Sequence, residues 1–416
     1  MQRYVIIGGG IAGINCIEGI RSVDRDGAIT LVTDEGDSNY GRPLISYYLE
    51  GKTDPSRMSY RGEDFYDRMG VTAIHGVSAE KIDTEARKVV LSNGSKLPYD
   101  KLCVAVGSSP FVPSMDGLGT VPERFSFMTL ADARALEAAV GSETRVLIVG
   151  GGLIGLKCAE GIRAKTERLT VCDLAPNVLS SILTPDASEL VEKHLDSLGI
   201  TLMLGDSVAR FEGTRAFMRS GAVVDFDVLV LAIGVRPNVS LVRDAGGEIG
   251  RGIVVGGRMA TTLPHVFAAG DCVESQNLVT GQRAPIAILP NAAQQGRTAG
   301  INMAGGEAET GDSVPMNSMG LFGLHIMTAG CYPGEGAGGQ TFSAIDGSSY
   351  KKLFAKDGRL VGFILMGDVH RAGIYTALIR EQRPLDSIDF EAVFQDPSLI
   401  PFGQAYRNQK LGGVVR

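Results

Sequence analysis

The chain has 416 residues, of which 44% are hydrophobic and 21% charged, a composition typical of a globular protein with two or three domains. Its net charge of -7 argues against a general nucleic-acid or membrane-surface binder, since such proteins carry a basic stripe. No run of about 18 apolar residues could span a bilayer, and a start in strand-like YVIIGGG offers no signal-peptide pattern, so we expect a cytoplasmic protein.

The first predicted unit is YVIIGGGIAGINCIEGIR at residues 4–21, which indicates a buried strand, a glycine-rich turn and a helix. A second strand, AITLVTDE at residues 28–35, completes a βαβ rhythm. In such a unit the glycines let a pyrophosphate approach the helix N-terminus, and an acid accepts from a ribose. The residues in these positions are Gly8, Gly10, Gly13, Asp34 and Glu35.

The same pattern returns in VLIVGGGLIGLKCAEGIR at residues 146–163, followed by the strand RLTVCDL at 168–174. Two copies in the same context predict two dinucleotide sites in one protein. A carboxylate placed for a 2'-hydroxyl repels a 2'-phosphate, and LAPNVL offers no Arg to bind one, so NADH is favoured over NADPH. The residues of the second copy are Gly150, Gly152, Gly155 and Asp173.

The rest of the chain suggests three domains. We expect one dinucleotide-binding domain from residues 1–112 with 246–315, a second from residues 113–245, and a third from residues 316–416. In the last, YKKLFAKDGRLVGFILMG predicts a strand pair with a KDGR turn, and RAGIYTALIREQ predicts a helix. The fold class is therefore α/β, with two doubly wound domains and a smaller α+β C-terminal domain.

Four further segments of the sequence resemble those of a known family of enzymes. YDKLCVAVGSSP, FDVLVLAIGVRPN, TTLPHVFAAGDCVE and PNAAQQGRTAG, together with both GxGxxG turns, resemble the FAD-dependent pyridine nucleotide-disulfide oxidoreductase superfamily over about residues 1 to 305. The resemblance implies a glutathione-reductase-like fold, FAD in the first site and NADH in the second, with Asp271 bonded to the ribityl chain. The implied FAD-binding residues are Gly8, Gly10, Ala12, Gly13, Asp34, Glu35, Arg42, Pro43, Gly107, Gly270 and Asp271. The implied NADH-binding residues are Gly150, Gly152, Gly155, Asp173 and Gly234.

The stretch NYGRPLISYYLEGK indicates the branch of the superfamily. Disulfide reductases carry a CxxxxC pair on the first helix, where this chain has only Cys16, and the redox cysteine of NADH peroxidases and water-forming oxidases falls at Pro43. YxRPxxS instead resembles rubredoxin, ferredoxin and putidaredoxin reductases and the flavin domain of assimilatory nitrite reductases. This implies electron flow from NADH through FAD to an iron-sulfur protein without a thiol.

Two positions depart from that branch. Its members often carry a Lys near the flavin paired with a Glu on the second fingerprint helix, where this chain has Tyr47 and Lys157, and the usual aromatic gate is Leu153. We take Lys157 and Tyr47 as the catalytic candidates. Lys157 would supply the missing positive charge to the reduced flavin, and the alternative is a solvated helix lysine.

We therefore expect an FAD-dependent NADH:acceptor oxidoreductase, free or as the NAD-linked flavin subunit of a larger complex. The alternatives are a thiol-free NADH oxidase and a non-catalytic FAD/NADH-binding scaffold. The C-terminal domain would form an interface in a homodimer or a hetero-oligomer. The six cysteines lack metal-site spacing and mostly lie in apolar runs, so we expect buried hydrophobes and no metal site.

Overall fold

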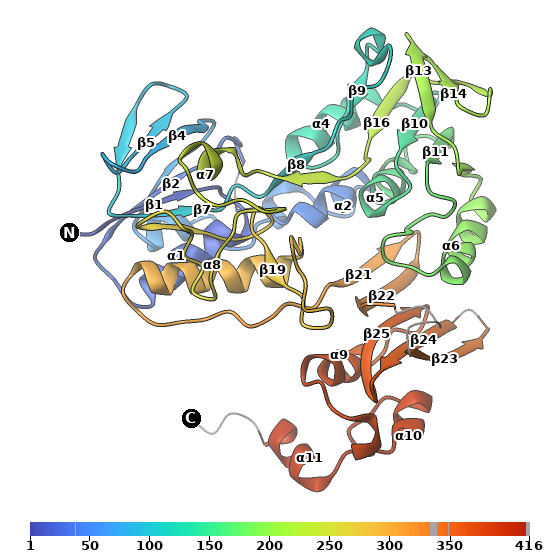
Figure 1. The fold of residues 1–416 in the computed structure, drawn as a ribbon. Coiled ribbons are helices and arrows are strands. Elements are labelled where there is room, and N and C mark those ends of the chain that lie inside the picture. The colour runs from blue at the N-terminus through green and yellow to red at the C-terminus, as the bar shows by residue number, and fades with distance from the viewer. Residues whose placement is uncertain (38, 333–338, 348, 413–416) are drawn as a thin grey trace. The chain divides into compact units, whose positions relative to one another are not determined.

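The computed structural model describes residues 1–416 except 38, 333–338, 348 and 413–416 (Figure 1). The chain forms two compact units. The first contains Met1–Ser180, Val191–Gln276 and Arg283–Ser313, and the second contains Ser181–Leu190, Asn277–Gln282 and Val314–Arg416. Both glycine-rich turns lie in the first unit, and the three predicted domain boundaries stay a prediction.

The first parallel sheet of unit one has the strand order β18-β7-β1-β2-β3. Its strands are β1 (Arg3–Ile7), β2 (Ala28–Val32), β3 (Val71–Ile74), β7 (Lys101–Val104) and β18 (Val266–Ala268). The four apolar residues of β1 are at most 4% exposed, as expected for a parallel strand covered on both faces. The late segment around HVFAAGD joins the first sheet, because β18 pairs with β7.

Helix α1 (Ile11–Arg21) follows β1 and lies beside α8 (Leu289–Met303), from the far end of the unit (Figure 1). The two helices approach closely because glycines stand at their contact. A Cβ on Gly296 would lie 2.1 Å from Ala12 O, and one on Gly300 would lie 2.1 Å from Cys16 O. Only glycine fits at these two positions.

The second parallel sheet has the order β12-β11-β10-β16-β9. Its strands are β9 (Arg124–Phe125), β10 (Val146–Val149), β11 (Leu169–Asp173), β12 (Thr201–Leu204) and β16 (Val228–Leu231). The associated helices are α4 (Leu130–Ala139) and α5 (Leu153–Ile162), and α6 (Pro185–Ser197) has residues in both compact units. Helix α4 begins at a capping box, in which Thr129 and Asp132 bond each other's backbone N–H groups.

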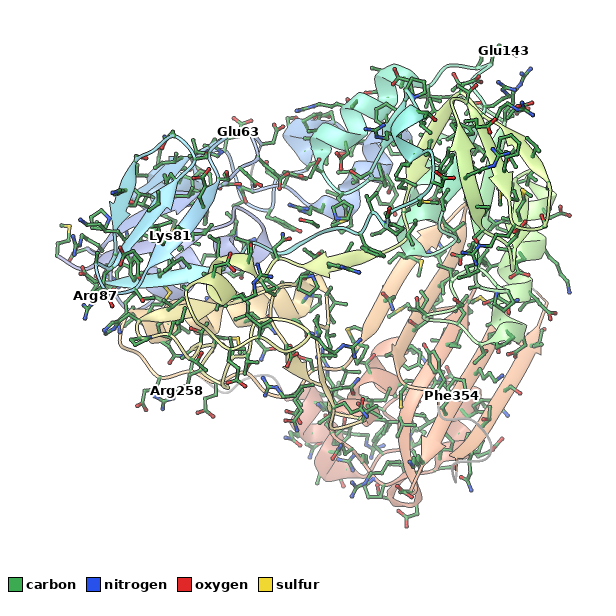
Figure 2. All side chains as sticks on the ribbon, turned by 45° about the horizontal axis from the view of Figure 1, so that its top comes forward. Glu63, Lys81, Arg87, Glu143, Arg258 and Phe354 are labelled. Carbon is green, nitrogen blue, oxygen red and sulfur yellow. The ribbon has the colours of Figure 1, made fainter. Side chains whose placement is uncertain are left out.

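Short elements complete the first unit. Three antiparallel groups are β4 (Ala79–Asp83) with β5 (Lys88–Leu91) and β6 (Lys96–Pro98), β13 (Val208–Glu212) with β14 (Arg215–Met218) and β15 (Val223–Asp225), and β8 (Ser108–Pro110) with β17 (Val235–Pro237). A further pair is β19 (Ser275–Gln276) with β20 (Arg283–Ala284). The helices are η1 (Arg42–Leu44), α2 (Ile45–Leu49), η2 (Pro55–Arg57), α3 (Phe65–Arg68), η3 (Leu118–Thr120) and α7 (Ser240–Asp244). Lys81 lies on β4, and Arg87 lies in the turn that joins β4 to β5 (Figure 2).

The second unit is built on an antiparallel sheet of order β21-β22-β25-β24-β23. Its elements are β21 (Met316–Leu321), β22 (Leu324–Gly330), β23 (Gly339–Asp346), β24 (Ser349–Lys356), β25 (Arg359–Met366), α9 (Ala372–Arg380), η5 (Leu385–Ser387), α10 (Phe390–Gln395) and α11 (Gln404–Leu411). The KDGR hairpin is confirmed, since Asp357 and Gly358 have the positive φ values, 50° and 68°, of a tight two-residue turn. The predicted helix is also confirmed as α9, and Phe354 of β24 is buried in this unit (Figure 2).

The predicted fold class is confirmed: two parallel five-stranded sheets with helices, and a smaller unit in which helices accompany an antiparallel sheet. Within the described part of the chain, every helix is too short or too polar to cross a membrane.

Candidate functional site

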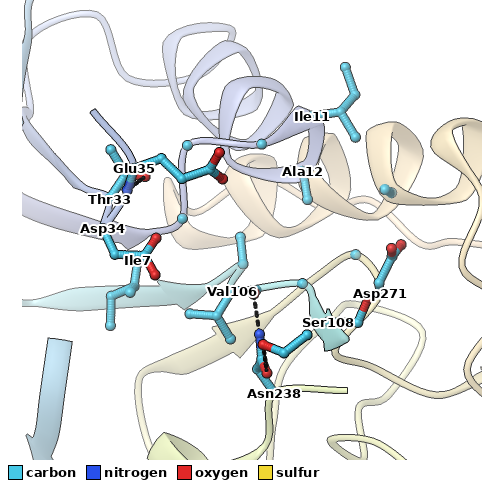
Figure 3. Close-up of a pocket in the computed structure, with 18 of the residues that line it drawn as sticks. Ile7, Ile11, Ala12, Thr33, Asp34, Glu35, Val106, Ser108, Asn238 and Asp271 are labelled. Carbon is cyan, nitrogen blue, oxygen red and sulfur yellow. Dashed lines mark hydrogen bonds between the residues drawn. The ribbon is translucent and has the colours of Figure 1, made fainter. Parts of the chain in front are cut away.

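A cavity of about 370 Å³ opens at the carboxyl ends of β1, β2 and β7 (Figure 3). Nine of the residues predicted to bind FAD line it: Gly8, Gly10, Ala12, Asp34, Glu35, Arg42, Gly107, Gly270 and Asp271. Gly13 and Pro43 do not appear in its lining. Ligands of open parallel sheets bind at this edge, so the cavity is the first candidate site.

The glycine-rich turn shapes one wall of the cavity. Gly8 has a φ of +114°, and a Cβ there would lie 2.1 Å from Ala105 O. A Cβ on Gly13 would lie 2.0 Å from Gly8 O, so Gly13 packs helix on turn behind the cavity. Beside Gly10 there is nothing within 4 Å, which leaves room for a ligand at the N-terminus of α1.

The two predicted acids have different surroundings. Glu35 forms an ion pair with Arg42 and accepts from the Tyr40 hydroxyl, while that hydroxyl accepts from Leu130 N–H over 3.1 Å. Asp34 is exposed at the cavity rim, and both acids are drawn in Figure 3. Glu35 therefore contacts the NYGRP segment, whereas Asp34 is the more exposed of the two acids, and both line the cavity.

Asp271 lies at the other end of the cavity. Burial raises the pKa of its carboxyl group, and the positive charge of Arg42 opposes this rise. The preceding Gly270 donates its N–H to Gln295 Oε1 of α8 over 2.9 Å, which fixes the turn that carries Asp271. Burial disfavours the charged form of this carboxyl group, so a hydrogen bond from a ligand hydroxyl would stabilise that form.

Tyr60 and Asn238 are among the polar residues that line this cavity and that sequence reasoning missed. Burial raises the pKa of Tyr60 to about 12, and its charged neighbours are Arg42 and Asp271. Asn238, which follows β17, donates its amide to Val106 O over 2.9 Å (Figure 3). The only sequence signal for Asn238 was its place at the end of GVRPN.

The second glycine-rich turn repeats the first in atomic detail. Gly150 has a φ of +121°, a Cβ on Gly155 would lie 1.9 Å from Gly150 O, and the space beside Gly152 is open. Asp173 accepts from Gly151 N–H at 2.6 Å and from Ala175 N–H at 2.8 Å. Gly234, with a φ of +136°, is likewise open where its Cβ would point.

The two catalytic candidates, Lys157 and Tyr47, contact each other, and neither is part of the cavity lining. The Lys157 ammonium lies 4.7 Å from the centre of the Tyr47 ring and pairs with Glu160. The Lys157 side chain is 15% exposed, so a solvated lysine does not describe it. Leu153, at the predicted gate, is 37% exposed at the start of α5.

Five of the six cysteines are buried and Cys331 is half-buried, which confirms the expected hydrophobic environment for the five. The described lining of the cavity contains none of them, and no disulfide joins two described cysteines. A hydrogen bond with Cys16 and burial raise the pKa of Cys103, so Cys103 is a poor thiolate. The described residues contain no group of three His, Cys, Asp or Glu side chains arranged for a metal ion.

Two family models match the sequence over most of its length. Residues 2–296 match the family described as pyridine nucleotide-disulphide oxidoreductase. Residues 315–383 match the C-terminal domain of rubredoxin NAD+ reductase.

Similar proteins match over nearly the whole chain. Subunit epsilon of an NADH-dependent phenylglyoxylate dehydrogenase from Aromatoleum evansii is 30% identical over 391 residues, 92% of each chain. A rubredoxin-NAD(+) reductase from Alcanivorax borkumensis is 30% identical over 380 residues, 88% of this chain and 96% of that one. A nitrite reductase [NAD(P)H] from Bacillus subtilis is 29% identical over 409 residues, 95% of this chain, which spans only 49% of that longer relative.

Among solved structures, the covalent putidaredoxin reductase–putidaredoxin complex superimposes with a TM-score of 0.86. The match covers 95% of this chain and 96% of that chain at 24% identity, a likeness that shows the fold alone.

Proposed function

Because the chain belongs to the pyridine nucleotide-disulphide oxidoreductase family, we propose that it exchanges a hydride with NAD and electrons, through FAD, with an iron-sulfur protein. It is an oxidoreductase, and its cofactors are FAD and NADH. FAD, when bound, converts a two-electron donor into a source of single electrons. The observation that carries the proposal is the cavity behind the first glycine-rich turn, whose described lining contains no cysteine.

The residues around this cavity fit FAD. The open side of Gly10 and the N-terminus of α1 would receive the pyrophosphate, with the positive charge of Arg42 nearby. Asp271 would accept a hydrogen bond from the ribityl chain, which relieves the unfavourable burial of its charge. Asp34, at the rim, would accept from the adenosine ribose.

The second glycine-rich turn fits NADH by the same reasoning. Gly152 leaves space at the N-terminus of α5 for the pyrophosphate. Backbone N–H groups on either side hold the Asp173 carboxylate, so it stays where a 2'-hydroxyl would donate and a 2'-phosphate would be repelled.

The iron-sulfur acceptor is supported by two observations. Five of the six cysteines are buried and the described lining of the cavity contains none, which supports electron transfer without a thiol step. The similar rubredoxin reductase and the match to its C-terminal domain favour a rubredoxin or ferredoxin type of acceptor. The similar epsilon subunit favours a second setting, in which the acceptor or donor is an iron-sulfur subunit of a larger complex.

The proposal includes a division of labour along the chain. Residues 1–112 with 246–315 would bind FAD, residues 113–245 would bind NADH, and residues 316–416 would form the interface with another subunit. Lys157 would act on the reduced flavin through the positive charge of its ammonium group. The negative charge of Glu160 already balances that charge in the ion pair.

An anaerobic mixing experiment tests this function. NADH should bleach the flavin absorbance, and an oxidised rubredoxin or ferredoxin should restore it faster than air does. A flavin that NADH leaves unbleached would support a scaffold role, and faster return in air than with either carrier would support an NADH oxidase.

A further inference from the structure

Helix α2 (Ile45–Leu49) packs directly on α5 (Leu153–Ile162), as Figure 1 shows. Gly161 makes this approach possible, since a Cβ there would lie 3.0 Å from Leu49 Cβ and 3.1 Å from Ser46 O. The two helices belong to the two halves of the site. Helix α2 continues the turn that carries Arg42 into the first cavity, and α5 begins at the second glycine-rich turn.

The polar centre of this contact is a cluster of three side chains. Lys157 of α5 lies with its ammonium 4.7 Å from the centre of the Tyr47 ring of α2, and its charge is matched by Glu160 of the same helix. The Lys157 and Glu160 side chains are only 15% and 8% exposed. Cation–π attraction and ion pairing are both stronger when water is excluded, so this geometry is well defined.

Tyr48, which follows Tyr47, connects α2 to a second helix, α4. Tyr48 donates its hydroxyl to Glu137 of α4, and Glu137 also pairs with Lys165 at 3.3 Å. Two consecutive tyrosines therefore hold α2 against α5 and α4. A five-residue helix has little stability of its own, so these contacts decide its position.

We propose that Tyr47, Lys157 and Glu160 form a clamp that aligns the NADH-binding turn with the FAD cavity, with Glu160 a positioning residue that acts by holding Lys157. The inference rests on the proposed hydride transfer between the two cofactors. Hydride transfer depends steeply on alignment, so a loosened clamp slows the transfer step without weakening either cofactor's binding.

The test compares the purified flavoprotein with Lys157→Met and Glu160→Gln by anaerobic stopped-flow. Both variants should reduce their flavin about tenfold more slowly at saturating NADH, equivalent to about 1.4 kcal/mol. The dissociation constants for FAD and NAD+ should stay within about twofold, and Lys157→Arg should restore most of the rate because it keeps the charge and the stacking. The matched control is Lys52→Met, because Lys52 lies 5.7 Å from the same ring but is 62% exposed. It should leave the rate unchanged.

Two readouts other than turnover separate the clamp from other roles. Amide hydrogen exchange in α2 should become faster in Lys157→Met and Glu160→Gln, and the midpoint potential of the flavin should stay the same. An unchanged limiting rate, or unchanged exchange in α2, overturns the clamp. A potential that falls in Lys157→Met and rises in Glu160→Gln also overturns it and assigns Lys157 a direct charge effect. If NADH fails to reduce the unmodified protein, the proposed function fails, and the exchange data still decide whether the clamp exists.

Discussion

At the end of β11, Asp173 and Leu174 are neighbours with opposite surroundings. The Asp173 carboxylate is held by two backbone N–H groups, whereas Leu174 is 66% exposed. A fixed acid beside a free, solvent-facing position is well suited to discriminate a 2'-hydroxyl from a 2'-phosphate. We therefore propose that these two residues set the preference for NADH.

The double variant Asp173→Ser with Leu174→Arg should shift kcat/KM toward NADPH by about tenfold, or about 1.4 kcal/mol. The change removes the repelling charge and adds a phosphate ligand. Leu174→Arg alone serves as the control and should shift the ratio less, because the acid remains. An unaltered preference for NADH in the double variant would contradict this role of the strand end.

Asp271 gives a second prediction at this scale, in the flavin-free protein. Because burial raises its folded-state pKa above the ordinary 3.8, the ionised carboxylate lowers stability as pH rises through the raised pKa. Flavin-free Asp271→Asn should therefore unfold at a higher temperature than the parent at pH 7, and the gap should close as pH falls toward 3.8. With FAD, the variant should bind flavin more weakly. Calorimetry and flavin fluorescence measure the two effects, and a less stable flavin-free variant would refute the reasoning.

Glycine spacing and strand-end acids are local patterns, so the sequence alone predicted nine of the residues that line the first cavity, among them two glycines of the turn and both acids. Tyr60 and Asn238 were not predicted because they lie in loops, and the path of these loops depends on the fold of the whole unit. The same limit applied to Glu35, since its bond to Tyr40 could not be read from two adjacent acids.

Among the elements, the α1–α8 contact shows how distant segments build one site. Helix α1 holds the first glycine-rich turn, and Gln295 of α8 holds the turn before Asp271. Their close approach needs glycine at Gly300, where a Cβ would meet backbone. The sequence predicted α1 as a helix but not its partner, because the pairing joins segments about 280 residues apart.

Gly300→Ala should lower the melting temperature by several degrees and reduce flavin content, since the helices must separate to admit a methyl group. The matched control is Gly373→Ala in α9, where a Cβ would meet nothing within 4 Å. The control should be neutral or slightly stabilising, as alanine favours helix. Equal melting temperatures and flavin contents for Gly300→Ala and the parent would show that the α1–α8 contact admits a methyl group without loss of stability.

At the scale of the whole molecule, the repeated opening pattern supplies two glycine-rich turns within the first compact unit. The first glycine-rich turn shapes the cavity proposed for FAD, the second shapes the place proposed for NADH, and α2 contacts α5 between them. Pro43 stands where the resemblance implies the redox cysteine of NADH peroxidases and water-forming oxidases, and Cys16 is buried against Met303. Electrons should therefore leave from the flavin itself.

An anaerobic reductive titration of the purified flavoprotein tests this claim most directly. Because the account gives the protein one redox group, it predicts uptake of two electrons per FAD, complete when the flavin absorbance is fully bleached. Uptake of four electrons per FAD would reveal a dithiol in exchange with the flavin and contradict a path without cysteine.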